Sequence, residues 1–304
     1  MALLDGDIIG TVPVQDERMK GATVKPYASA REDRDYLLDY KSVDLASLQR
    51  VDLLDVPVDN VNRDEGVARI MDMVERKDGP HFVFFADPVK LMQVRPGKKL
   101  SFIARDSDLI LADGAGLPWA ARKLGTPLKE RIPMIAFLMD VIRLSVKREF
   151  TIYLLGSRME YLEKVFLNLT RSFPGVRIIG RQGGYFNEER GERIKESLRK
   201  SSPDIIFVGM GFPIQELWTR ENIQSLSRAV VIGVDGAFDI LSGMERKAPD
   251  YFQVRGLSWF WRTLVRPMNL IRWFAMYGFY IKTFFRAIKV NRRKRKEQKL
   301  AAQK

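Results

Sequence analysis

The chain has 304 residues, of which 46% are hydrophobic, so it is long enough for one large domain with a substantial buried core. It contains no cysteine, which excludes disulfide bonds, thiolate catalysis and cysteine-ligated zinc. The one histidine, His81, argues against a His-based metal site or a Ser-His-Asp triad, and its turn-rich surroundings suggest a solvated loop residue. Residues 1–5 lack the basic flank and apolar run of a secretory signal, so we expect a cytoplasmic protein.

Along the chain, the pattern changes near residue 49. Residues 1–48 are polar and weakly periodic, and we expect an N-terminal extension of low order. The sequence then predicts a strand at 51–56 and a helix at 63–76 with Asn62 as its N-cap. Further short apolar runs are bounded by Gly, Pro or Asp and separated by helical stretches; they lie at 81–85, 109–112, 150–155, 176–179, 204–208 and 229–233. This alternation predicts an α/β domain over 49–244, with a mainly parallel sheet and helices on both faces.

In such a sheet, ligands bind beyond the carboxyl ends of the strands, so the residues that follow the apolar runs are candidates for the site. Asp113 follows a buried run and precedes two glycines, where a carboxylate can deprotonate an attacking hydroxyl. The alternative is an ordinary turn aspartate, and Asp239 has the same two interpretations. Arg131 can hold a diphosphate, although an isolated arginine after a turn is commonly a surface residue.

The Gly209 and Gly211 turn lacks the third glycine of the dinucleotide fingerprint, so it is weak evidence for a nicotinamide-dependent oxidoreductase. It does suit a phosphate that approaches backbone amides at a helix start. That helix is expected to open with Pro213 at its first position and Gln215 in its first turn. A tight strand–helix turn without a ligand is the alternative.

The whole net charge of +13 lies in the last fifth of the chain. Residues 245–304 carry 16 Lys and Arg against three acidic residues, and they are rich in aromatic side chains. Their longest uncharged run, 273–281, is too short to span a bilayer. The pattern predicts an amphipathic helical appendage at 245–291 that lies on an anionic membrane surface, followed by a flexible basic tail at 292–304. Basic and aromatic residues together also suit nucleic acid, but no recognised nucleic-acid motif accompanies them, so we expect no such partner.

Several motifs together resemble the WecG/TagA/CpsF family of bacterial glycosyltransferases (glycosyltransferase family 26). Among them are Ala-Asp-Gly-Ala-Gly at 112–116, Gly-Gly-Tyr-Phe at 183–186 and Val-Asp-Gly-Ala-Phe-Asp at 234–239. The others lie at 119–128 with Arg131, 153–156, 208–216, 246–249 and 256–259. The resemblance runs from about residue 51 to about residue 273, in the order and spacing of the family.

The resemblance implies a Rossmann-like domain and an appendage that meets the cytoplasmic face of the cell membrane. It implies transfer of an N-acetylmannosamine-type or related sugar from a UDP-sugar to a polyprenyl-diphosphate-linked acceptor in cell-surface polysaccharide or teichoic-acid-type biosynthesis. It further implies inversion at the anomeric carbon and a homo-oligomer. No Asp-x-Asp motif of the nucleotide-sugar type is evident, so we expect no metal and no cofactor.

Carried over residue by residue, the resemblance makes Asp113 the catalytic base. It places the following residues around the substrates and the departing diphosphate: Asp87, Arg131, Gly209, Gly211, Gln215, Asp239, Arg262 and Arg272. Guanidinium groups suit a diphosphate because they offer several donors at once.

This chain departs from the family pattern at a few positions. Phe85-Ala-Asp87 stands where the family usually has Thr-x-Asn, and residues 134–136 replace a Gly-x-Asp. Asn269 and Ser258 replace a basic residue and a glutamate of the appendage. These departures leave two hypotheses open: an altered substrate pair, or a catalytically weakened relative that acts as a membrane-surface nucleotide-binding or scaffold protein.

Overall fold

The computed structural model describes residues 40–226, 228–244, 251 and 270–301, and within the last range it describes the side chains of 274–293. Expectations for 1–39, for most of 245–269 with Arg262, and for the side chain of Arg272 therefore lie outside the described residues.

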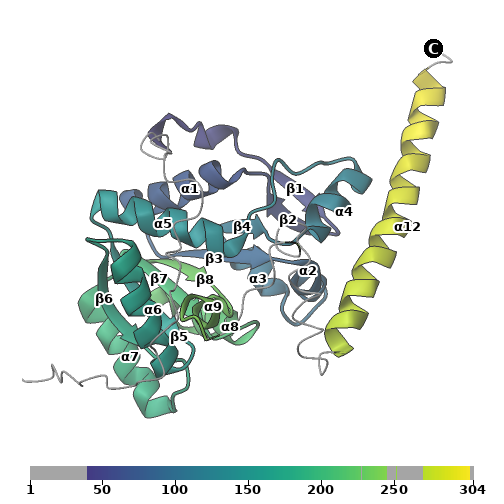
Figure 1. The fold of residues 1–304 in the computed structure, drawn as a ribbon. Helices are drawn as coiled ribbons and strands as arrows, with labels where there is room; N and C mark the ends of the chain where they lie inside the picture. The colour runs from purple at the N-terminus through teal and green to yellow at the C-terminus, as the bar shows by residue number, and fades with distance from the viewer. Residues whose placement is uncertain (1–39, 227, 245–250, 252–269, 302–304) are drawn as a thin grey trace, which may run out of the picture.

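A six-stranded sheet with the order β4-β3-β8-β7-β5-β6 forms the centre of the fold, and every neighbouring pair is parallel (Figure 1). Its strands are β3 (His81–Ala86), β4 (Leu109–Ala112), β5 (Thr151–Gly156), β6 (Arg177–Gln182), β7 (Ile205–Gly209) and β8 (Val230–Gly233). All six correspond to apolar runs of the sequence, so the prediction of a mainly parallel α/β sheet is confirmed.

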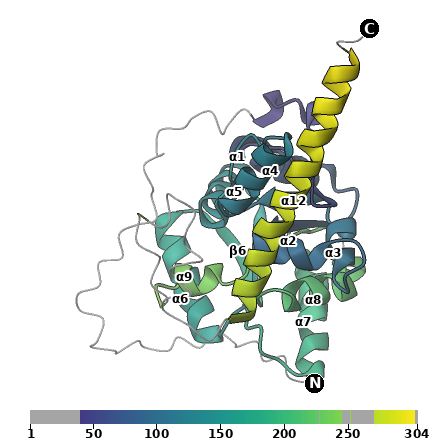
Figure 2. The same cartoon turned by 90° about the vertical axis from the view of Figure 1, so that its right-hand side faces the viewer.

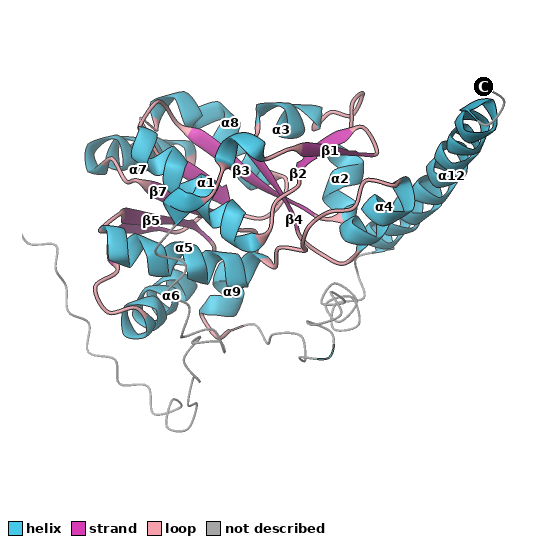
Figure 3. Ribbon diagram, turned by 90° about the horizontal axis from the view of Figure 1, so that it is seen from above, coloured by secondary structure: helices cyan, strands magenta, loops and turns pink. Residues whose placement is uncertain are grey.

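Helices cover both faces of the sheet, and they bury the side chains of the inner strands on both sides. In β3, Val83 and Phe85 face one hydrophobic cluster, whereas Phe82 and Phe84 face another. The first face carries α1 (Arg63–Arg76), α5 (Met134–Arg148), α6 (Met159–Ser172) and α9 (Ala237–Leu241). The second carries α2 (Pro88–Val94), α3 (Ser101–Asp106), α4 (Gly116–Leu124), α7 (Glu188–Ser201) and α8 (Ile214–Asn222). Figure 3 shows α3 and α8 along one face and α5, α6 and α9 along the other.

The start of α1 is the predicted one. Asn62 accepts a hydrogen bond from the Glu65 backbone N–H at 2.8 Å, and the Glu65 carboxylate accepts one from the Asn62 N–H at 2.8 Å. This reciprocal capping box satisfies two N–H groups that the helix itself leaves unpaired.

The prediction of a single strand at 51–56 is wrong. The structure has an antiparallel hairpin there, β1 (Arg50–Leu53) and β2 (Val56–Asp59). Leu54 and Asp55 form its two-residue turn with φ values of 56° and 73°. Turns with two positive φ angles match the twist of a hairpin but are unfavourable for leucine. Leu54 is fully buried in the core, and this burial offsets the strain.

The last part of the N-terminal extension is packed, contrary to the expectation for 1–48. Tyr40 is buried in the core and donates a short hydrogen bond to Glu75 of α1. The Arg148 guanidinium lies 5.0 Å from the centre of the Tyr40 ring. A 3₁₀ turn, η3 (Leu45–Ser47), then leads to β1. The ordered domain therefore begins before residue 49.

The C-terminal helix α12 (Leu270–Ala301) runs without a break through residue 292, where a flexible tail had been expected to begin. It packs on α2 and α4 (Figure 2) through the buried side chains of Met276, Phe279, Thr283 and Ala287. Arg286 ties it to the β1–β2 turn through ion pairs with Asp55 and Asp52.

The opposite side of α12 is also apolar, so the helix does not divide into one apolar and one polar face as expected. Its exposed aromatic and aliphatic side chains are Phe274, Tyr277, Ile281, Phe284 and Phe285. None of the helices in the described part of the chain is both long and apolar enough to cross a membrane.

The two sides of α12 give a matched pair of variants. Phe279 is fully buried, so Phe279→Ala should weaken the docking of α12 by about 3–5 kcal/mol. Phe284 is 59% exposed, so Phe284→Ala should leave docking unchanged. Faster tryptic cleavage within α12 should therefore appear in the first variant alone. Equal cleavage rates in the two variants would contradict the packing described here.

Candidate active site

The carboxyl ends of β4, β3 and β8 bring three acidic residues to one edge of the sheet. Asp113 follows β4, Asp87 follows β3 and Asp235 lies two residues beyond β8. These strands are neighbours in the sheet, although Asp87 and Asp235 are 148 residues apart in the sequence. The edge thus gathers carboxylates that the sequence order does not place together.

The loop that carries Asp113 is fixed by short backbone contacts. The Asp113 N–H donates to the Ala86 carbonyl at 2.8 Å, and the Gly114 N–H donates to Asp113 Oδ1 at 2.7 Å. Gly114 has a φ of +81°, and a Cβ on Gly116 would lie 2.5 Å from Pro88 Cγ. Both glycines are therefore required by the path of the loop, which sets the carboxylate at the strand end.

Burial raises the pKa of the half-buried Asp113 carboxyl above its ordinary value, and nearby Asp87 adds to this effect. The Gly114 N–H, Arg131 and Lys90 act in the opposite direction. Arg131 lies close because the neighbouring Ile132 N–H donates to the Ala112 carbonyl at 2.8 Å. A carboxylate made more basic by its surroundings is suited to accept a proton from a substrate hydroxyl.

Asp87 caps helix α2. Its Oδ1 accepts hydrogen bonds from the backbone N–H groups of Val89 at 2.7 Å and Lys90 at 2.8 Å. These contacts give one carboxylate oxygen a structural role. The substrate-binding role assigned to Asp87 from the sequence stays a prediction.

Lys90 is a charged residue of the site that the sequence analysis missed. It is 4% exposed, and its ammonium group forms a short ion pair with Asp235 and donates to the Phe85 carbonyl at 3.0 Å. Burial opposes its charge, but the attraction of Asp235, Glu216 and Asp87 outweighs burial and raises the pKa of Lys90. The available signal was a lysine in the otherwise apolar first turn of a helix at a strand end.

Gln215 connects helix α8 to the residue that pairs with Lys90. Its Nε2 donates to Asp235 Oδ1 and to Glu216 Oε1, both at 2.9 Å, and its Oε1 accepts from the Asp235 N–H at 3.0 Å. The amide is 1% exposed and therefore acts as a buried bridge. Burial raises the pKa of Glu216 to about 7, and its Oε2 has no hydrogen-bond partner within the described residues.

A second group of candidates lies where β5 and β7 end side by side. The Ser157 N–H donates to the Gly209 carbonyl at 2.7 Å, and Ser157 Oγ donates to Asp239 Oδ1 at 2.6 Å. A Cβ on Gly156 would lie 2.3 Å from the Gly209 carbonyl oxygen, so the two strand ends approach closely. Beyond them Gly211, with a φ of +80°, borders open space.

The β5–β7 boundary is a topological switch point. The connection from β5 to β6 runs through α6 on one face of the sheet, whereas β7 leads to β8 through α8 on the other face. Loops that leave neighbouring strands in opposite directions leave a crevice between them, and open α/β sheets bind their ligands there.

The family model of the WecG/TagA/CpsF glycosyl transferases matches residues 51–297 of this chain. The chain belongs to this family. The region matched contains the whole sheet, both groups of site residues and most of α12. The protein is therefore a glycosyltransferase.

Curated relatives agree with this assignment. The chain is 27% identical over 195 residues, covering 64% of this chain and 74% of the relative, to the N-acetylglucosaminyldiphosphoundecaprenol N-acetyl-beta-D-mannosaminyltransferase of Bacillus spizizenii. It is likewise 27% identical over 217 residues, covering 71% of this chain and 85% of the relative, to the enzyme of the same name from Staphylococcus aureus strain NCTC 8325.

Within this family member the sequence-predicted residues fall into two groups on one edge of the sheet. Asp113, Asp87, Arg131 and Gln215 lie around the ends of β4, β3 and β8, and Gly209, Gly211 and Asp239 lie at the switch point. Gly209 has no room for a side chain, since a Cβ would lie 2.5 Å from Phe238. Pro213 is the N-cap of α8, so its placement at the first helical position is wrong by one residue.

Two of the residues that depart from the family pattern, Phe85 and Met134, lie within the described part of the structure. Phe85 is 1% exposed and packs edge-on against Phe137, with ring centres 5.5 Å apart. Met134 begins α5 and is partly buried against the same core cluster. Phe85 therefore belongs to the hydrophobic core, and Met134 packs against its margin.

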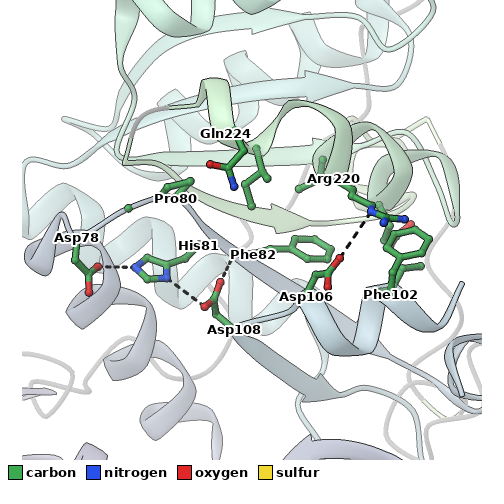
Figure 4. A pocket seen from close by; sticks show the side chains of 14 residues that line it. Asp78, Pro80, His81, Phe82, Phe102, Asp106, Asp108, Arg220 and Gln224 are labelled. Atoms are coloured by element: carbon green, nitrogen blue, oxygen red, sulfur yellow. Dashed lines mark hydrogen bonds and ion pairs between the residues drawn. The ribbon is translucent and has the colours of Figure 1, made fainter. Parts of the chain in front are cut away.

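A separate pocket of about 530 Å³ opens at the amino end of β3, the end of the strand opposite to Asp87 (Figure 4). His81 lies there between Asp78, at 2.8 Å, and Asp108, at 3.5 Å. Its side chain is only 12% exposed and it begins strand β3, so the expectation of a solvated loop residue is wrong. None of the residues predicted for the site lines this pocket.

The raised pKa of Glu216 predicts a pH-dependent stability. Its ordinary value is 4.5, so between about pH 4.5 and pH 7 the unfolded chain ionises while the folded protein holds the proton. Stability must then fall by about 3 kcal/mol as the pH rises through this window. Glu216→Gln removes the titration, so this variant should be more stable than the wild type at pH 8 and nearly equal to it at pH 4.5.

Urea unfolding at several pH values measures this difference. Glu221→Gln, on the exposed side of the same helix, is the control and should follow the wild-type curve. A Glu216→Gln curve parallel to that of the wild type between pH 4.5 and pH 8 would contradict the prediction.

Proposed function

We propose that this protein transfers an N-acetylmannosamine-type sugar from a UDP-sugar to N-acetylglucosamine linked through a diphosphate to a polyprenol. The names of the curated relatives supply the acceptor and the sugar. The observation that carries the proposal is the half-buried Asp113 carboxylate with its raised pKa, which lies after β4 at the same edge of the sheet as the switch point between β7 and β5. A direct transfer requires a proton acceptor and a place for the nucleotide, and open α/β sheets bind nucleotides at such switch points.

The reaction is a single displacement. Asp113 takes the proton from an acceptor hydroxyl while that oxygen forms a bond to the anomeric carbon of the donor sugar. The bond from this carbon to the UDP oxygen breaks on the opposite face, so the configuration inverts and UDP leaves with the electron pair. Holding both substrates in line supplies much of the rate.

The departing diphosphate needs positive charge or N–H groups. The Gly211 turn faces open space at the start of α8, where backbone N–H groups suit a phosphate. Arg131 lies near Asp113 and is a candidate for the side of the diphosphate nearer the sugar. We extend this role to Arg262 and Arg272 of the appendage on the basis of family membership.

Helix α12 connects the site to a lipid surface. Its exposed side combines large apolar side chains with basic ones: Phe274, Tyr277, Ile281, Phe284, Phe285, Lys282 and Lys289. Aromatic rings favour the headgroup region, and basic residues favour anionic lipid. We therefore propose peripheral attachment to the cytoplasmic face of the cell membrane, with the polyprenyl acceptor entering from that surface.

The same helix contacts the Asp113 loop. Trp119 of α4 packs edge-on against Tyr280, with ring centres 5.0 Å apart, and a Cβ on Gly116 would lie 3.3 Å from the Tyr280 hydroxyl. The proposed membrane contact and the proposed base are thus joined by direct packing. The hypothesis of a non-catalytic scaffold loses support, because Phe85 is part of the core and Met134 packs against it.

The test of the proposed base is Asp113→Asn. This change should lower turnover by a factor of about 10²–10⁴ and leave UDP affinity within about twofold, because the amide keeps the shape but cannot accept the proton. Transfer from UDP-N-acetylmannosamine to a lipid-linked acceptor gives turnover, and calorimetry gives UDP affinity. Asp72→Asn, on the surface of α1, is the control. Unchanged turnover in Asp113→Asn would exclude Asp113 as the base.

The test of the membrane surface is the double variant Phe284→Ala/Phe285→Ala. It should reduce sedimentation with anionic vesicles by about tenfold or more, because each exposed ring contributes roughly 1.5–3 kcal/mol when it enters an apolar environment. Leu167→Ala, an exposed apolar residue on α6, should bind like the wild type. Added salt should weaken binding of all three proteins. Wild-type binding by the double variant would show that α12 does not contact the lipid.

A further inference from the structure

A partly buried ion pair, in which the lysine is buried and the aspartate is partly exposed, lies near the proposed base. Lys90 is on α2 and Asp235 follows β8, and their contact ties together two segments that the sheet brings side by side. Removing one partner of such a pair leaves an uncompensated charge in the interior, whereas replacing both by uncharged groups is often tolerated. The pair therefore links α2 to the end of β8, and a double variant can remove this link without leaving an unpaired charge.

Asp235 is held by more than Lys90. Its backbone has a φ of 46°, in the left-handed region, which aspartate adopts more readily than most other residues. Gln215 fixes this conformation from both sides, since it donates to the Asp235 carboxylate and accepts from the Asp235 N–H. The network therefore joins α2, α8 and the end of β8 into one unit.

Lys90 also acts on the strand that positions Asp113. Its ammonium group donates to the carbonyl of Phe85, and the carbonyl of the next residue, Ala86, accepts the hydrogen bond from the Asp113 N–H. The hydrogen bond from Lys90 to β3 is therefore one residue away from the hydrogen bond that holds the Asp113 loop on β3.

Charged groups from three segments act on Asp113. Asp87, from the β3–α2 junction, opposes ionisation of Asp113, while Arg131 and Lys90 favour it. Around Lys90 itself lie Asp235, Glu216 and Asp87. Without Lys90, Asp87 would still oppose ionisation of Asp113, Arg131 would be the remaining cation among these groups, and Asp235 would lose its ion-pair partner.

We infer that Lys90, paired with Asp235, is a positioning residue for the base: it fixes the end of β3 that holds the Asp113 loop and places a positive charge near the Asp113 carboxylate. The inference deepens the proposed function and rests on it. Lys90 is 4% exposed and acts through Asp113, so it should affect turnover more than substrate affinity.

The experiment compares three variants with the wild type: Lys90→Met, the double variant Lys90→Met/Asp235→Asn, and the surface control Lys200→Met. In the double variant, asparagine keeps the acceptor for Gln215 and tolerates a positive φ, so the fold should be retained without an unpaired charge. Turnover should fall by about tenfold or more in both Lys90 variants, with KM for the UDP-sugar within about twofold.

The pH dependence separates positioning from mere stabilisation. A base must be ionised to act, and removal of the Lys90 charge makes Asp113 harder to ionise, so the rising limb of the turnover profile should move to higher pH. The ¹³C signal of the Asp113 carboxyl, assigned with Asp113→Asn, should titrate at higher pH in the same variants. Lys200→Met should match the wild type in every measurement.

The outcomes are distinct. Recovery of wild-type turnover and pH profile in the double variant would overturn the inference, because Lys90 would then only balance the charge of Asp235. An unmoved Asp113 titration would overturn it whether or not transfer is observed. A wild-type protein that transfers no sugar, combined with a shifted titration, would overturn the proposed function and leave the link between Lys90 and Asp113 standing.

Discussion

All six strands of the central sheet run parallel, so their carboxyl ends and the loops that leave them meet at one edge. The hydrogen bond from the Asp113 N–H to the Ala86 carbonyl continues the β3–β4 pairing by one residue beyond the strands. This hydrogen bond holds the first residue of the loop, the proposed base, in the register of the sheet. The position of Asp113 therefore depends on the sheet as a whole, and the glycines at 114 and 116 let the chain turn away behind it.

Gathering loops at one edge also gathers negative charge. Asp87, Asp113 and Asp235 lie there, and Glu216 is joined to Asp235 through Gln215. A buried carboxylate is costly without a partner. This cost is offset in three ways: Lys90 pairs with Asp235, backbone N–H groups at the start of α2 donate to Asp87, and the raised pKa of Glu216 favours its neutral form. Among these four groups, Asp113 combines partial exposure with a raised pKa, and this combination supports its proposed role as the base.

Helix α12 is apolar on two sides for two different reasons. The side with Phe279 completes the core over α2 and α4, and the side with Phe284 and Phe285 remains exposed. A helix docked in this way presents a fixed apolar strip, because Arg286 anchors it to the β1–β2 turn and Tyr280 packs on Trp119. The proposed lipid contact is consequently rigid with respect to the Asp113 loop, which suits a substrate whose reactive sugar must reach the base from a membrane surface.

Local pattern was sufficient for much of this protein. Short apolar runs bounded by Gly, Pro and Asp determined the strands, Asn62 with Glu65 determined the start of α1, and the linked loop motifs determined the family. Side-chain periodicity and turn chemistry act over a few residues, so the sequence displays them directly. Contacts across long separations in the chain are not displayed in this way. The tertiary structure decided the pairing of Lys90 with Asp235, the burial of Phe85, Tyr40 and Leu54, and the two apolar sides of α12. Each depends on segments that are distant in the sequence and lie side by side only in the fold.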